Sequence, residues 1–129
     1  MTDFSYLNVD NAYKLINQKV TKTPLVTNDY INNLLEAEIY FKLENLQNTG
    51  SFKLRGATHK ITKLIENVKD SGVVAYSSGN HAQAVAYASM INSISAKIIM
   101  PKTAPQIKIE KFNNFSFYFI FFIQSSISK

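Results

Sequence analysis

The stretch VVAYSSGNHAQAVAYASM, residues 73–90, decides the fold predicted for this chain. Its first part, Val73–Tyr76, is apolar and follows a glycine, which is typical of a short buried strand. A polar turn comes next, and the residues after it are predicted to form a helix with small side chains at close intervals. These small residues are Ala82, Ala84, Ala86 and Ala88. The stretch therefore predicts a strand, a tight turn and a helix in succession.

A further strand after this helix makes the predicted sheet parallel. Residues 96–100 are mostly apolar, and Pro101 stops the strand. Pro105 can open another helix, because its missing N–H is not needed in a first turn. Two strands joined by a helix of this length form a parallel pair with a right-handed crossover. The predicted fold class is α/β, with parallel strands and flanking helices.

Three more elements are predicted upstream. A helix is expected over residues 11–19, with Asp10 as its cap, and the alternating segment 38–44 is expected to be a strand. A second helix is expected to begin at Ser51 as the N-cap, which places Lys53 in its first turn. The apolar stripe of this helix consists of Leu54, Ala57, Ile61, Leu64, Ile65 and Val68.

The polar turn at residues 77–83 is the first candidate site. It lies at the carboxyl end of a predicted strand and leads into a helix, so its backbone N–H groups are available to an anion such as a substrate carboxylate. Ligands of open parallel sheets gather at this end of the strands. The alternative is an ordinary helix cap, in which His81 is a packed or capping residue.

Lys53 is the second candidate, because it stands at a helix start beside Phe52 and two glycines. The positive end of the helix dipole disfavours an ammonium group there, so a buried lysine at this position is favoured as a neutral amine. A neutral amine can attack an aldehyde, and pyridoxal phosphate (PLP) is the common biological aldehyde that uses one. The alternative is a surface lysine on a helix.

Together, the two motifs resemble one family. KLENLQNTGSFKLRGA at residues 42–57 resembles the segment that carries the PLP lysine in serine racemases and serine/threonine dehydratases. Residues 77–83 resemble their substrate-carboxylate loop, and MPKTAP at 100–105 resembles the strand end that follows. The resemblance covers roughly residues 21–111. It implies an incomplete fold-type II PLP-enzyme fold, similar to that of tryptophan synthase β, and a homodimer.

The resemblance also implies roles for individual residues. Lys53 would bind PLP covalently and act as a base on one face of the substrate Cα. Phe52 would pack against the pyridine ring, and Asn80 would hydrogen-bond the 3′ oxygen of the cofactor. The carboxylate of a small substrate, L-serine or L-threonine, would be held by Ser77, Ser78, Asn80, His81 and neighbouring amides.

Ser78 separates the two activities within this family. Serine racemases use a serine at this position as the acid/base on the second face, whereas threonine dehydratases more often have alanine there. Both racemisation and β-elimination begin with the same carbanion. The alternative is a small polar residue tolerated in a turn, and Ala82, which many dehydratases share, weakens the racemase interpretation.

The resemblance divides the chain into three parts. Residues 1–68 are assigned to the large PLP-binding domain, residues 69–111 to the beginning of the small domain, and residues 112–129 to an atypical tail. Six of the nine phenylalanines lie between positions 112 and 122. The tail is interpreted as the product of a shifted reading frame, a retained intron or a decayed gene, and the alternative is a terminal strand at residues 115–123.

Two functions therefore stay open. In the family, the glycine-rich phosphate loop, the contact to the pyridine nitrogen and the metal-binding carboxylates of serine racemases are expected beyond Lys111. This sequence contains none of them, so a catalytically inactive remnant is favoured over an enzyme that works by assembling with another chain. Cofactor binding is then incomplete in this chain.

The composition argues against several other classes. The lysines are spread along the chain despite the formal charge of +5, so nucleic-acid binding is not predicted. The apolar run at residues 115–123 is far shorter than the roughly 20 residues of a membrane-spanning helix, so no membrane partner is predicted. Two histidines and no cysteine argue against a metal site. The absence of cysteine suits a reducing compartment, and the cytoplasm is the expected location.

Overall fold

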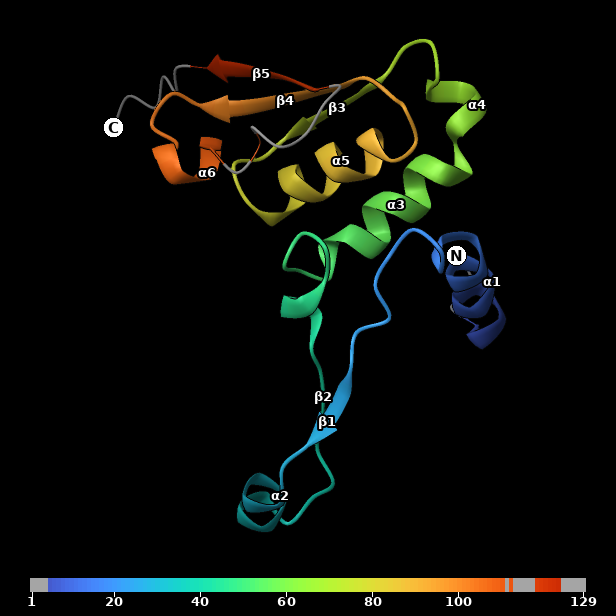
Figure 1. The fold of residues 1–129 in the computed structure, drawn as a ribbon, viewed down its shortest axis with the longest axis vertical. Helices are drawn as coiled ribbons and strands as arrows, with labels where there is room; N and C mark the ends of the chain where they lie inside the picture. Colours follow the sequence, from blue (N-terminus) through green and yellow to red (C-terminus); the bar gives the residue numbers. More distant parts are fainter. Residues whose placement is uncertain (1–4, 111, 113–117, 124–129) are drawn as a thin grey trace.

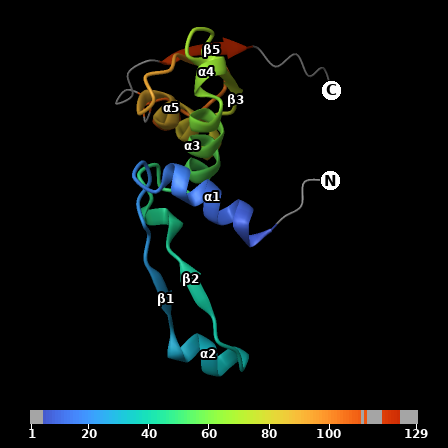
Figure 2. The ribbon, with the colours of Figure 1, turned by 90° about the vertical axis from the view of Figure 1, so that its right-hand side faces the viewer.

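The computed structural model describes residues 5–110, 112 and 118–123. A three-stranded sheet forms one end of the molecule. Three helices follow it in layers, in the order α5 (Asn80–Met90), α3 (Lys53–Lys63) and α1 (Tyr6–Ile16) (Figure 1). A narrow arm of two strands and one helix projects from the opposite end, as the perpendicular view confirms (Figure 2). No helix in the described part of the chain is both long and apolar enough to cross a bilayer.

The sheet is parallel, as predicted. β3 (Val73–Tyr76) pairs with β4 (Ala96–Pro101), and Val73 stands opposite Ala96. β5 (Tyr118–Ile123) pairs with the other edge of β4, so the strand order is β3-β4-β5. The carboxyl ends of all three strands lie at the same edge of the sheet, because the strands run in one direction.

Of the residues after Lys111, the described stretch 118–123 continues this sheet. Phe112 is fully buried, and the backbone of β5 is paired with β4 along its whole length. The strand alternative for the tail is therefore confirmed over Tyr118–Ile123, whereas residues 115–117 of the predicted strand lie outside the described residues. The reading-frame interpretation concerns the gene and stays a hypothesis.

Helix α5 (Asn80–Met90) lies between the sheet and α3 (Lys53–Lys63). A helix that is covered on opposite sides carries small residues, because they allow close approach of both neighbours. The predicted alanines serve this purpose, and each of them is almost completely buried. Leu54 and Ile61 of α3 and Ile98 and Met100 of β4 complete the centre of the core.

The second predicted helix is two helices. α3 ends at Lys63 and α4 (Ile65–Val68) follows after Leu64, whose amide is shared between the carbonyls of Lys60 and Ile61. The prediction of Ser51 as N-cap is wrong, because the cap position is Phe52 and the Ser51 hydroxyl has no hydrogen-bond partner. Lys53 is the first residue of α3, in agreement with its predicted place in the first turn.

The first helix also differs from the prediction in its bounds. α1 covers Tyr6–Ile16, and the Ser5 side chain caps it by accepting a hydrogen bond from the amide of Asn8. Asp10 lies inside this helix, so its predicted capping role is wrong, and it forms an ion pair with Lys14 at 2.6 Å. α6 (Gln106–Glu110) follows Pro105, as expected.

The projecting arm contains β1 (Leu25–Thr27), α2 (Asp29–Leu35) and β2 (Tyr40–Lys42). β1 and β2 form an antiparallel pair. β2 forms the central part of the strand predicted at residues 38–44. All three of its residues are exposed, so the alternation of apolar residues in the sequence does not correspond to a buried face. The 3-10 turn η1 (Glu44–Leu46) connects the arm to the segment before α3.

Gly72 at the turn into β3 is a site where substitution is expected to destabilise the fold. Its φ is +74°, and a Cβ atom would lie 2.7 Å from the carbonyl oxygen of Ser95, a backbone atom that accepts the amide of Val73. Gly72→Ala should lower the free energy of unfolding by about 2 kcal/mol or more. Gly56→Ala is the matched control, because it adds a Cβ into open space in a helix and should stabilise by about 0.5–1 kcal/mol. Urea denaturation measures both changes, and equal stabilities would contradict this account of the turn.

Candidate active site

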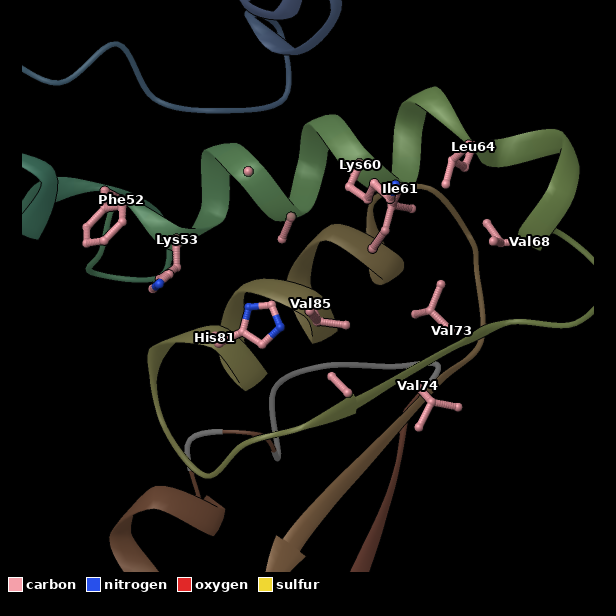
Figure 3. A pocket seen from close by; sticks show the side chains of 13 residues that line it. Phe52, Lys53, Lys60, Ile61, Leu64, Val68, Val73, Val74, His81 and Val85 are labelled. Atoms are coloured by element: carbon pink, nitrogen blue, oxygen red, sulfur yellow. The ribbon is translucent and has the colours of Figure 1, made fainter. Parts of the chain in front are cut away.

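A cavity of about 500 Å³ lies between α3 and the unit formed by β3 and α5. Figure 3 shows the side chains of Lys53 and His81 extending from their helices into this space. Lys53 and His81 lie at one end of the cavity, Lys60 adds a third polar side chain further along α3, and most of the other lining residues are apolar. The residues that line it include Phe52, Lys53, Gly56, Lys60, His81 and Val85.

Lys53 lies at the polar end of the cavity. Its Nζ atom stands 5.0 Å from the centre of the Phe52 ring, a cation–π distance. Its side chain is exposed, so the burial considered for this lysine from the sequence is not found among the described residues. An exposed amine at a cavity mouth is accessible to an aldehyde entering from solution.

The start of α5 supplies the second polar group of the site. Gly79 is its N-cap and makes no side-chain cap, and the amide of Gln83 is the first to bond back into the helix, to the Gly79 carbonyl. The preceding amides of the first turn, Asn80 to Ala82, have no intrahelical partner. Such amides suit an anion, and the helix dipole adds to the attraction.

The remaining predicted site residues lie on the same turn but do not line the cavity. Ser77 ends the pairing of β3, because its amide donates to the Ile99 carbonyl, and its hydroxyl accepts the amide of Gly79 at 3.2 Å. Ser78 is partly buried between these two residues, and Asn80 is exposed. The structure thus brings Phe52, Lys53 and His81 to one cavity, whereas Ser77, Ser78 and Asn80 are not among its lining residues.

Sequence reasoning missed Lys60 and Gly56 as lining residues. They follow Lys53 by seven and three positions, so all three lie on one face of α3. This helical spacing was the signal that could have identified them. Gly56 leaves the face open, because a Cβ there would have no neighbour within 4 Å.

An ion pair holds the start of α3 from the side away from the cavity. Nε and Nη2 of Arg55 donate to the two carboxylate oxygens of Glu44 at 2.9 and 2.7 Å. The hydrogen bonds from Arg55 hold the pKa of the Glu44 carboxyl below its ordinary value, and a hydrogen bond from Thr23 adds to this against the effect of burial. Sequence reasoning missed this pair, because nothing in the spacing of Glu44 and Arg55 predicts their contact.

Comparison with known proteins assigns the chain to a family. Residues 16–116 match the family model described as "Pyridoxal-phosphate dependent enzyme". The chain belongs to this family of PLP-dependent enzymes. The predicted fold-type II architecture is confirmed for the part of the fold that the chain contains.

Named relatives within the PLP-dependent enzymes agree with the resemblance. The chain is 44% identical to a serine racemase of Dictyostelium discoideum over 109 residues, which are 84% of this chain and 34% of the relative. It is 50% identical to a biosynthetic L-threonine dehydratase of Lactococcus lactis over 103 residues, 80% of this chain and 25% of the relative. The crystal structure of the Dictyostelium discoideum serine racemase superposes with a TM-score of 0.87 at 39% identity, covering 94% of this chain and 39% of that chain. The chain thus spans about a quarter to a third of the length of these curated relatives.

The residues present fit PLP, the cofactor of this family. Lys53 offers a primary amine to the aldehyde, and the apolar walls of the cavity suit a planar ring. The unbonded amides at the start of α5 suit a carboxylate or another anion. The four glycines of the chain are spaced apart, so the sequence contains no glycine-rich loop for the phosphate group.

Proposed function

We propose that this chain forms the lysine-bearing and carboxylate-binding part of a PLP-dependent active site for racemisation and β-elimination of small hydroxy amino acids. One observation carries the proposal: the amine of Lys53 and the first turn of α5 meet at the same cavity. The relatives named serine racemase and L-threonine dehydratase support the reaction class. The substrate is L-serine or L-threonine, because both carry the β-hydroxyl that elimination removes.

Cofactor binding in this proposal rests on three side chains. Lys53 would attach PLP covalently, Phe52 would pack against its ring, and Asn80 would donate a hydrogen bond to its 3′ oxygen. When bound, PLP supplies an electron-withdrawing ring that stabilises negative charge at the substrate Cα. The phosphate finds no glycine-rich loop in this chain, so the affinity of residues 1–129 for the cofactor depends mainly on Lys53.

Substrate binding uses the turn at the carboxyl end of β3. The carboxylate is held by the amides of the first turn of α5 together with Ser77, Ser78, Asn80 and His81. The positive end of the helix dipole favours this charge, and the fixed carboxylate orients the Cα–H bond.

Two residues exchange protons with the substrate on opposite faces. The Nζ atom of Lys53 takes the proton from Cα on one face. Delivery of a proton from the hydroxyl of Ser78 to the other face gives the D-enantiomer. Departure of the β-hydroxyl as water, together with the proton removed from Cα, instead gives an enamine, which a second water hydrolyses to an oxo acid and ammonia. Both outcomes share the first proton transfer, so one site performs both reactions. The homodimer implied by the resemblance stays part of the proposal.

Product analysis tests the proposed function. The purified protein, incubated with PLP and L-serine, is expected to form D-serine together with pyruvate and ammonia, and chiral chromatography and a coupled ammonia assay measure them. Matched incubations with L-threonine decide the preferred substrate. Formation of neither product from either substrate would contradict the proposal and support the alternative of a catalytically inactive remnant.

A further inference from the structure

The start of α3 lacks the contacts that usually fix the first turn of a helix. No side chain caps it, and its first turn contains no acidic residue. The Ser51 hydroxyl, in the usual capping region, is buried and has no hydrogen-bond partner within the described part of the chain. Lys53 is the first residue of this helix, so its direction depends on how the helix start is held.

The ion pair between Arg55 and Glu44 anchors the start of α3 in place of a side-chain cap. Its guanidinium makes a two-pronged ion pair with Glu44, and the side chains are only 25% and 15% exposed, respectively. A fork of this kind fixes orientation as well as distance. Arg55 follows Lys53 by two positions, so the two side chains leave the helix in different directions, and Arg55 does not line the cavity.

The same anchor is tied to the chain before the arm. Arg55 also donates to the carbonyl of Thr21 at 3.1 Å. The side-chain amide of Gln47 bonds both backbone groups of Thr21, at 2.8 and 2.9 Å, and thereby joins this segment to the loop that precedes Lys53. The loop is also hydrogen-bonded to α5, because the side-chain amide of Asn48 donates to the hydroxyl of Tyr87 at 3.1 Å. The anchor therefore ties the lysine segment to the helix whose first turn faces the same cavity.

We propose that the Glu44–Arg55 pair is a positioning device that aims Lys53 into the cavity. This inference rests on the proposed function of Lys53 as the PLP-binding residue. Neither member of the pair touches the cavity, so each acts through the orientation of α3. Loss of the fork should leave the amine present but misdirected, and a small misplacement of a reacting group strongly reduces its reactivity.

Selective labelling by PLP tests this inference. The protein is treated with PLP and borohydride, and peptide mass spectrometry measures the label on Lys53 relative to Lys63, an exposed lysine at the far end of the same helix. Glu44→Gln and Arg55→Lys should each lower this ratio by about ten- to a hundredfold. Arg55→Lys retains the charge, so it keeps the test valid where Glu44→Gln fails to fold.

Two control variants separate positioning from stability. Glu66→Gln removes an exposed ion pair with Lys69 of 2.7 Å, and Gly72→Ala weakens the fold elsewhere, so neither should change the ratio when circular dichroism shows folded protein. A wild-type ratio in the folded Arg55→Lys variant would overturn the inference and leave the proposed function intact. If PLP labels Lys53 no more than Lys63 in the unsubstituted protein, both this inference and the proposed function of Lys53 would be overturned.

Discussion

Lys53→Ala is expected to reduce turnover of L-serine by at least about a thousandfold, because a covalent catalyst and its amine cannot be replaced by the remaining contacts. The expected loss includes both D-serine and pyruvate, since both reactions need the same first proton transfer. The measurement is the initial rate of each product at saturating PLP.

Lys63→Ala is the matched control for this variant. It removes an exposed lysine from the same helix outside the cavity, so product formation should stay close to that of the unsubstituted protein. Comparable losses in Lys53→Ala and Lys63→Ala would contradict the assignment of Lys53, because they would trace to helix stability or surface charge.

Ser78→Ala is expected to reduce formation of D-serine by about a hundredfold or more, the upper part of the range for a general acid or base. Elimination should persist at a substantial fraction of its original rate, because it needs no proton from the second face. The ratio of D-serine to pyruvate, measured in one reaction mixture, reports this separation without correction for the amount of active protein. An equal loss of both products would contradict the two-face division of roles.

Local patterns in the sequence predicted the elements that form the site. The apolar run of β3, the alanines of α5 and the place of Lys53 at a helix start were all confirmed, because each depends on residues close together in the chain. Helix α2 was missed although it had a signal: Asn28 caps it by accepting the amide of Ile31. None of its residues is buried, and a helix without a buried face gives a weak periodic pattern.

Long-range contacts could not be predicted in this way. Arg55 meets Glu44 across the loop before α3, and Gln47 bonds a backbone segment 26 residues away. The choice of cap also depends on such contacts: Ser51 has a favourable side chain for capping, yet the fold places it outside the cap position with its hydroxyl unpaired. Local propensity is a weak guide where tertiary structure sets the helix start.

The most direct test of Lys53 as the PLP-binding residue is to locate the lysine that PLP modifies. The protein is incubated with PLP, reduced with borohydride, digested and mapped by mass spectrometry. The label is expected predominantly on Lys53, with loss of the visible absorbance of the PLP–lysine adduct on reduction. A label concentrated on another lysine, or spread evenly over the exposed lysines, would contradict it.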